Sequence, residues 1–291
     1  MKFQGVMPAL ITPVKADGSL NEKELCRLIE HHLSQGADGF YIGGATGEGL
    51  IISKETHKAL TKLAIEAVAH RVPCIVHVAR MNYEEMLELA RYAEQVGADA
   101  ISAIPPLFYR YNDDGIYDYY KGLAKSVSIP VVIYNNPSTG VAFSIDLLRR
   151  LFSIPGVNAI KWTTYDFSTV MQLRAEFPDA DIINGPDEMM LMGLSAGCNA
   201  CIGTTYNFAL PLYRRIYDLY RDGKIEEARR VQMQACRIIN VLARYNVIAV
   251  TKLITSRQGF DVNHPIYPSQ KYGPEAEDRI MQELVAAGLK I

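Results

Sequence analysis

The chain has 291 residues, a formal net charge of -2 at pH 7 and a sequence pI of about 6.3. It contains no lysine or arginine run of the kind that marks nucleic-acid binding, and no apolar run long enough to span a membrane. A small-molecule role is therefore favoured. The opening stretch MKFQGVMPALITPV has a proline inside its apolar part and no small-residue cleavage site, which predicts a first strand rather than a signal peptide.

The five cysteines are scattered and too few for a disulfide framework at this length, so we expect a cytoplasmic protein. Cys198 and Cys201 form a C-x-x-C, but an apolar strand follows them instead of a helix that would activate a thiol. Only His77 among the six histidines lies near a predicted strand end, so no cluster of metal ligands is expected.

A sequence pattern recurs along the chain in which a glycine follows a helical stretch and an apolar strand follows the glycine. Examples are SQGADGFYIGG, QVGADAISAIPP and SAGCNACIGTT. Glycine accepts the left-handed conformation that ends a helix, and the apolar run after it is typical of a buried parallel strand. The predicted strands cover residues 5–12, 38–43, 73–79, 99–104, 129–134, 157–162, 180–184 and 199–204.

Amphipathic segments such as NEKELCRLIEHHLSQ lie between these strands. Strict alternation with eight strands favours an α/β fold of the (β/α)8 TIM barrel type over an open doubly wound sheet. We expect the barrel to cover residues 1–223, with its last helix near 209–222. Residues 224–291 are expected to form a C-terminal three-helix extension, near 225–247, 249–257 and 275–288, packed on the barrel or on a neighbouring subunit.

Two side chains at predicted strand ends carry the chemistry, because reactions in such barrels occur at the C-terminal ends of the strands. Lys161 lies between Ile160 and Trp162 in the apolar run VNAIKW. Loss of hydration there favours the neutral amine, which can attack a carbonyl; the alternative is a buried lysine paired with a carboxylate. Tyr134 ends VVIYNNP one strand earlier and could act as acid or base, or serve only in packing.

Two further motifs allow both a functional and an ordinary interpretation. The GGATGEG loop at 43–49 could hold a carboxylate or phosphate with its backbone N–H groups, or be a tight turn. Asp187 and Glu188 could bind substrate, or simply lie where a helix N-terminus favours negative charge.

Taken together, GGATGEG, YNNPSTG at 134–140, Lys161 in AIKWT and the three-helix tail resemble the dihydrodipicolinate synthase and N-acetylneuraminate lyase superfamily over essentially the whole chain. GPDE at 185–188 and GTTYN at 203–207 resemble its lyase branch. The resemblance implies that Lys161 forms the imine and that Tyr134 shuttles a proton. It implies a homotetramer, and no metal or organic cofactor besides the covalent imine on Lys161. Substrate contacts are implied for Ala45, Thr46, Thr163, Gly185, Asp187, Glu188 and Thr204.

Three positions depart from the family pattern. Lyases often carry serine where this chain has Ala45, so the proton relay must lack that hydroxyl. The aromatic residue that some members contribute to a neighbouring site aligns with Phe108, which leaves Tyr109 as a weaker candidate. Synthases usually place an arginine after the YNxP turn, whereas the turn at 137–140 is one residue shorter and has none.

The leading hypothesis is therefore Schiff-base cleavage of N-acetylneuraminate to pyruvate and N-acetylmannosamine. The alternatives are another pyruvate-dependent aldolase for a 2-keto-3-deoxy sugar acid, and dihydrodipicolinate synthase. From a different class, a noncatalytic sugar-acid-binding barrel remains open, although loss of Lys161 or Tyr134 would be expected in such a protein and both are present.

Overall fold

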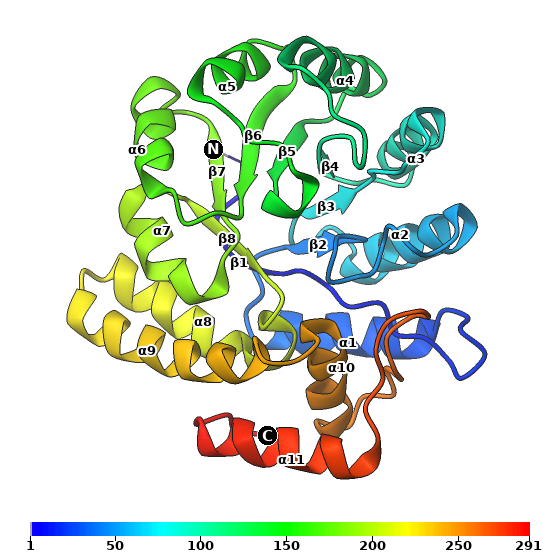
Figure 1. The fold of residues 1–291 in the computed structure, drawn as a ribbon, viewed down its shortest axis with the longest axis vertical. Coiled ribbons are helices and arrows are strands. Elements are labelled where there is room, and N and C mark those ends of the chain that lie inside the picture. Colours follow the sequence, from blue (N-terminus) through cyan, green and yellow to red (C-terminus); the bar gives the residue numbers. More distant parts are fainter. Residues whose placement is uncertain (1) are drawn as a thin grey trace.

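Eight parallel strands form the centre of the computed structural model, which describes residues 2–291 (Figure 1). The strands pair in the order β1-β8-β7-β6-β5-β4-β3-β2. Between β1 and β2, Leu10 N donates to Tyr41 O at 2.9 Å and Asp38 N donates to Val6 O at 3.0 Å, which brings the two ends of the sheet together. The strands are β1 (Gly5–Pro8), β2 (Phe40–Ile42), β3 (Cys74–His77), β4 (Ala100–Ala103), β5 (Val131–Asn135), β6 (Val157–Trp162), β7 (Asp181–Asn184) and β8 (Ala200–Gly203).

A helix follows every strand, so the predicted (β/α)8 barrel is confirmed. Side chains fix several helix starts; Ser53 Oγ, for example, accepts a hydrogen bond from Thr56 N at 3.0 Å. The first strand is shorter than predicted because only an isolated bridge, Ala9 with Tyr41, continues its ladder. The barrel helices are α1 (Glu22–Ser34), α2 (Lys54–Val68), α3 (Tyr83–Gln95), α4 (Asp113–Lys125), α5 (Ile145–Phe152), α6 (Phe167–Glu176), α7 (Met190–Ala196) and α8 (Tyr206–Arg221).

Three further helices form the C-terminal extension: α9 (Ile225–Leu242), α10 (Val247–Arg257) and α11 (Pro274–Ala286). The first ends earlier than the predicted residue 247, because Asn246 caps a new helix by accepting from Ala249 N at 3.0 Å. A second apolar core joins the extension to α8, with Phe208 packed among residues such as Ile238, Ile254 and Leu284. The predicted boundary at 223/224 falls in the turn between α8 and α9.

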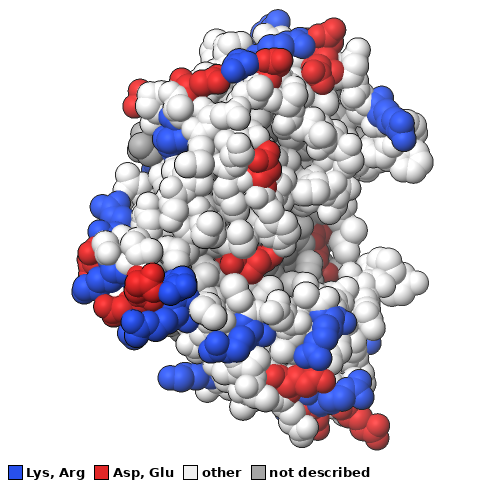
Figure 2. Space-filling model, turned by 60° about the vertical axis from the view of Figure 1, so that its left-hand side comes forward, with Lys and Arg blue, Asp and Glu red and all other residues white. Residues whose placement is uncertain are grey.

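The face in Figure 2 carries no large patch of a single charge among the described residues. Lys and Arg alternate there with Asp and Glu at the upper and lower edges, and much of the middle is uncharged. Among residues 2–291, no single helix is long and apolar enough to cross a membrane; α9 and α10 meet that test only as a pair, across a bend of 113°.

Candidate active site

Lys161 and Tyr134 lie side by side in the barrel. They are register partners on the neighbouring parallel strands β6 and β5, and both are buried, with 5% and 4% of their surface exposed. Lys161 Nζ lies 4.2 Å from the centre of the Tyr134 ring. Within residues 2–291, no carboxylate oxygen forms an ion pair with this amine. The interpretation of Lys161 as one half of a structural ion pair is therefore wrong.

Two further rings lie near Lys161: Tyr41, which the sequence reasoning missed, and His77, which it considered only as a possible metal ligand. Tyr41 on β2 places its ring centre 4.6 Å from Lys161 Nζ and its hydroxyl 3.0 Å from Ser102 Oγ. His77 on β3 is buried, and burial lowers its pKa to about 3, so the ring is neutral at physiological pH. A polar side chain within a short apolar strand is the signal that could have identified both. The rings of Tyr41 and Tyr134 thus lie against the amine, and the neutral imidazole of His77 packs against both rings.

The GGATGEG loop covers the end of β2 in a tightly fixed conformation. Thr12 Oγ1 donates to Gly47 O at 2.6 Å, and Arg80 donates to Gly49 O at 3.1 Å. A Cβ on Gly49 would lie 1.8 Å from Gly43 O, so only glycine fits there. Ala45 is exposed, whereas Thr46 is buried, with its Oγ1 2.7 Å from Thr204 Oγ1 on the loop after β8. This contact joins two predicted substrate-binding segments that are 158 residues apart.

Five of the predicted substrate contacts line one cavity with a volume of about 490 Å³. Gly185 creates space in this cavity, since a Cβ there would lie 2.1 Å from Thr163 Oγ1, a buried hydroxyl without a hydrogen-bond partner among the described residues. The side towards the extension is apolar and includes Ile239, Leu242 and Val247. The five are Thr163, Gly185, Asp187, Glu188 and Thr204; Lys161, Tyr134, Ala45 and Thr46 are not among the lining residues.

The two carboxylates of GPDE have different environments. Asp187 is buried, and its Oδ2 accepts hydrogen bonds from Thr205 N at 2.8 Å and Thr205 Oγ1 at 2.6 Å. Burial raises the pKa of Asp187 to about 7. Glu188 is half-buried, and its Oε1 accepts a hydrogen bond from Tyr165 Oη at 2.5 Å. Glu188 is therefore the more accessible of the two carboxylates.

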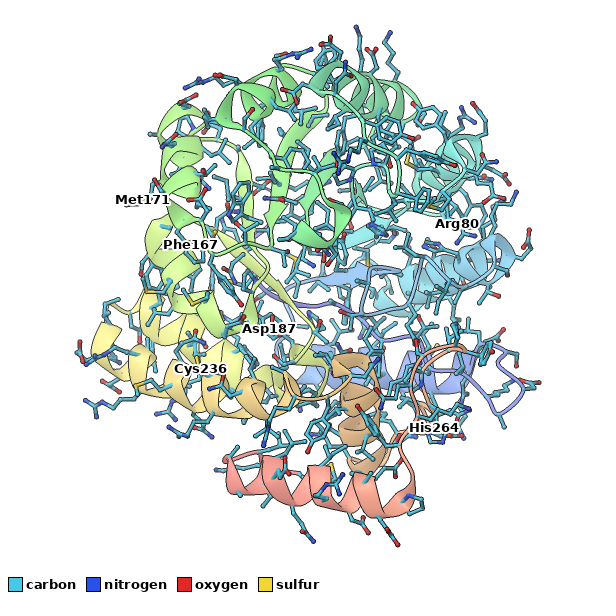
Figure 3. The ribbon with its side chains drawn as sticks, in the orientation of Figure 1. Arg80, Phe167, Met171, Asp187, Cys236 and His264 are labelled. Carbon is cyan, nitrogen blue, oxygen red and sulfur yellow. The ribbon has the colours of Figure 1, made fainter. Side chains whose placement is uncertain are left out.

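Helix α9 of the C-terminal extension packs against the segment that carries Asp187 and Glu188. Gln232 Nε2 on α9 donates to Asp187 O at 3.1 Å, and Cys236 Sγ lies 3.3 Å from Glu188 O. In Figure 3, Asp187 lies between the barrel strands and α9, the helix that carries Cys236. Arg80 lies on the opposite side of the barrel. The segment that carries both carboxylates is thus held by a helix outside the barrel.

The three departures from the family pattern have structural counterparts. Ala45 has no hydroxyl to offer a relay, and Tyr134 Oη accepts a hydrogen bond from Asn136 Nδ2 at 3.3 Å. Phe108 and Tyr109 are exposed on the β4–α4 connection, and Phe108 has a positive φ of 72°. The short turn after β5 is a 3-10 turn, Pro137–Thr139, which ends at Gly140. The assignment of Tyr109 to a site stays a prediction.

An aldolase that works through a lysine imine can be built from a (β/α)8 barrel, a buried lysine and an adjacent tyrosine. This chain has all three features. A family model described as the dihydrodipicolinate synthetase family matches residues 2–287. The chain belongs to this family, and the resemblance inferred from its motifs is confirmed.

Relatives named as lyases resemble the chain over nearly its whole length. An N-acetylneuraminate lyase of Rhizobium meliloti is 34% identical over 286 residues, which cover 98% of this chain and 95% of that one. Two solved structures superpose with a TM-score of 0.94: CdNal from Clostridium difficile in complex with mannosamine and the N-acetylneuraminate lyase of Proteus mirabilis. The first is 30% identical and covers 99% of this chain and 100% of that chain; the second is 29% identical and covers 99% of both.

Proposed function

We propose that the chain is a Schiff-base aldolase that cleaves N-acetylneuraminate to pyruvate and N-acetylmannosamine. The observation that carries the proposal is the buried pair of Lys161 and Tyr134 on neighbouring strands, with the amine free of any ion pair within the described residues. The likeness to proteins named N-acetylneuraminate lyase supports this substrate, as does the absence of arginine from the 137–140 turn, which disfavours the synthase alternative.

Each step uses groups of the chain. Neutral Lys161 adds to the C2 carbonyl, and Tyr134 gives its proton to the departing hydroxyl as the iminium forms. Tyr134 then takes the proton of the C4 hydroxyl, the C3–C4 bond breaks, and the electron pair moves to the iminium nitrogen. The C4 fragment leaves as the aldehyde N-acetylmannosamine, Tyr134 returns its proton to C3 of the enamine, and water hydrolyses the iminium to release pyruvate and free Lys161.

The remaining predicted residues hold the substrate. Backbone N–H groups near Ala45 and Thr46 receive its carboxylate, while Glu188, Asp187, Thr163 and Thr204 line the cavity proposed for its polyol tail, where Gly185 leaves the necessary space. No metal or organic cofactor is required in this scheme, so activity should survive dialysis against EDTA.

Trapping the imine tests the chemistry. Borohydride added with pyruvate should attach a reduced three-carbon adduct to Lys161, detectable by peptide mass mapping, and Lys161→Met should abolish it. The absence of an adduct from the intact enzyme would overturn the aldolase mechanism. If pyruvate is released from a simpler 2-keto-3-deoxy acid but not from N-acetylneuraminate, the chemistry stands and the substrate assignment fails.

A homotetramer and a cytoplasmic location are part of the same proposal. Exposed apolar side chains support association: Phe108 is 85% exposed, and Met171, Met192 and Met233 on α6, α7 and α9 are each more than half exposed. Light scattering coupled to size-exclusion chromatography should give the mass of four chains.

A further inference from the structure

Tyr165 lies on the rim of the tail cavity, in the β6–α6 connection, and no role was predicted for it. Its ring belongs to the cavity lining although 67% of the residue is exposed. Its hydroxyl donates to Glu188 Oε1 at 2.5 Å. The hydrogen bond to Glu188 raises the pKa of Tyr165, so the phenol keeps its proton near neutral pH and remains a donor.

This contact matters because Glu188 is the accessible carboxylate of the cavity. Asp187 is buried and its Oδ2 is taken by Thr205, which leaves Glu188 to accept hydrogen bonds from the outer part of a tail. A carboxylate has two oxygens with about four acceptor positions, and Tyr165 uses one of them on Oε1. Among residues 2–291 no hydrogen bond engages Glu188 Oε2, so this oxygen can accept one from a ligand.

A free glutamate at a cavity rim loses rotamer freedom when a ligand orders it, and this loss weakens binding. A hydrogen bond that already fixes the side chain removes part of that cost. We infer that Tyr165 is a specificity-determining residue that positions Glu188 for sugar acids with a long polyol tail. The inference rests on the proposed function and extends it to the choice among substrates.

The test compares N-acetylneuraminate with a six-carbon 2-keto-3-deoxy acid, whose chain is three carbons shorter, so we expect its tail not to contact Glu188. Tyr165→Phe removes only the hydroxyl, and because the side chain is exposed we expect normal folding. KM for N-acetylneuraminate should rise about three- to tenfold, the size expected for a hydrogen bond to a charged acceptor at a partly exposed site. KM for the short acid and kcat for both should be unchanged.

Glu188→Gln and the double variant, Tyr165→Phe with Glu188→Gln, complete a double-mutant cycle. In the Glu188→Gln background, Tyr165→Phe should raise KM clearly less than it does in the unaltered enzyme, because the amide oxygen still accepts a hydrogen bond but carries no charge. Tyr111→Phe, which removes a hydroxyl from another exposed tyrosine, is the matched control and should leave both KM values unchanged.

Three results would overturn the inference: no change in KM, an equal change for both acids, or a lower KM for N-acetylneuraminate, which would make Tyr165 a competitor of the tail. Failure of the proposed function is distinct, since the unaltered enzyme would then release no pyruvate from N-acetylneuraminate, whereas the inference is tested by how its KM changes in the variants.

Discussion

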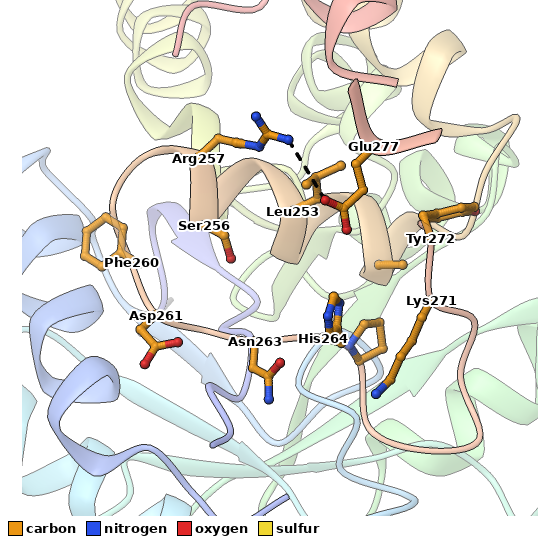
Figure 4. Close-up of a pocket in the computed structure, with 12 residues that line it drawn as sticks. Leu253, Ser256, Arg257, Phe260, Asp261, Asn263, His264, Lys271, Tyr272 and Glu277 are labelled. Carbon is orange, nitrogen blue, oxygen red and sulfur yellow. Dashed lines mark ion pairs between the residues drawn. The ribbon is translucent and has the colours of Figure 1, made fainter. Parts of the chain in front are cut away.

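A buried ion pair between Glu48 and Lys252 ties the GGATGEG loop to the C-terminal extension. Lys252 Nζ lies 2.6 Å from Glu48 Oε2, with side-chain exposures of 0% and 3%. Lys252 also donates to His264 O at 3.2 Å, while Glu48 Oε1 accepts from Ile266 N at 2.7 Å. Burial lowers the pKa of Lys252, and the negative charge of Glu48 opposes that shift. Figure 4 shows the segment that carries His264 passing below α10.

Removing one partner leaves the other charge buried without compensation. Each of Lys252→Met and Glu48→Gln should therefore lower the free energy of unfolding by about 3–5 kcal/mol. The double variant leaves no buried charge and should recover most of that loss, so it should cost far less than the two single changes added together, a coupling energy of about 4 kcal/mol or more. Lys62→Met, which breaks an exposed pair with Glu66, is the control and should cost less than about 1 kcal/mol.

Urea unfolding followed by circular dichroism, at one protein concentration and pH 7, measures all four variants. Because Glu48 belongs to the loop proposed to hold the substrate carboxylate, the single variants that remain folded should also show a higher KM for the keto acid. The reasoning would be refuted if both single changes cost less than about 1 kcal/mol and their effects simply added in the double variant.

Other predictions concern the site. Burial raises the pKa of Asp187 from 3.8 to about 7, so the folded chain retains a proton that the unfolded chain releases. This contribution to the free energy of unfolding is complete below about pH 4 and is lost as the pH rises through about 7. The free energy of unfolding of the unaltered protein, measured relative to Asp187→Asn, should therefore fall between about pH 4 and 7. If this difference in unfolding free energy stays flat or rises, the prediction is wrong. Gly185→Ala should reduce kcat/KM at least about tenfold, since its Cβ would lie 2.1 Å from Thr163 Oγ1, whereas Gly273→Ala, with no atom within 4 Å, should leave kcat/KM unchanged. Tyr134→Phe should lower kcat at least about 100-fold, and borohydride should still trap pyruvate on Lys161 but more slowly, since water must then supply the proton; unchanged turnover would exclude Tyr134 as the proton shuttle.

The order of elements and the two central residues could be predicted because their signals are local. Glycine-terminated helices alternating with apolar strands define the barrel, and a lysine within VNAIKW is unusual in any fold. The parallel register of β5 and β6 then makes Lys161 and Tyr134 neighbours. Helix ends near Asn246 were less accurate: the helix predicted to reach residue 247 ends at Leu242, because Asn246 caps the helix that follows.

The surroundings of Lys161 and the cavity required the tertiary structure. Tyr41 reaches Lys161 only because the barrel closes, and Glu48 meets Lys252 across about 200 residues of chain, a contact that no local pattern contains. The sequence places Asp187 and Glu188 next to each other but cannot distinguish them. Packing decides that Asp187 is buried against Thr205 while Glu188 faces Tyr165, because burial depends on which distant segments cover each side chain.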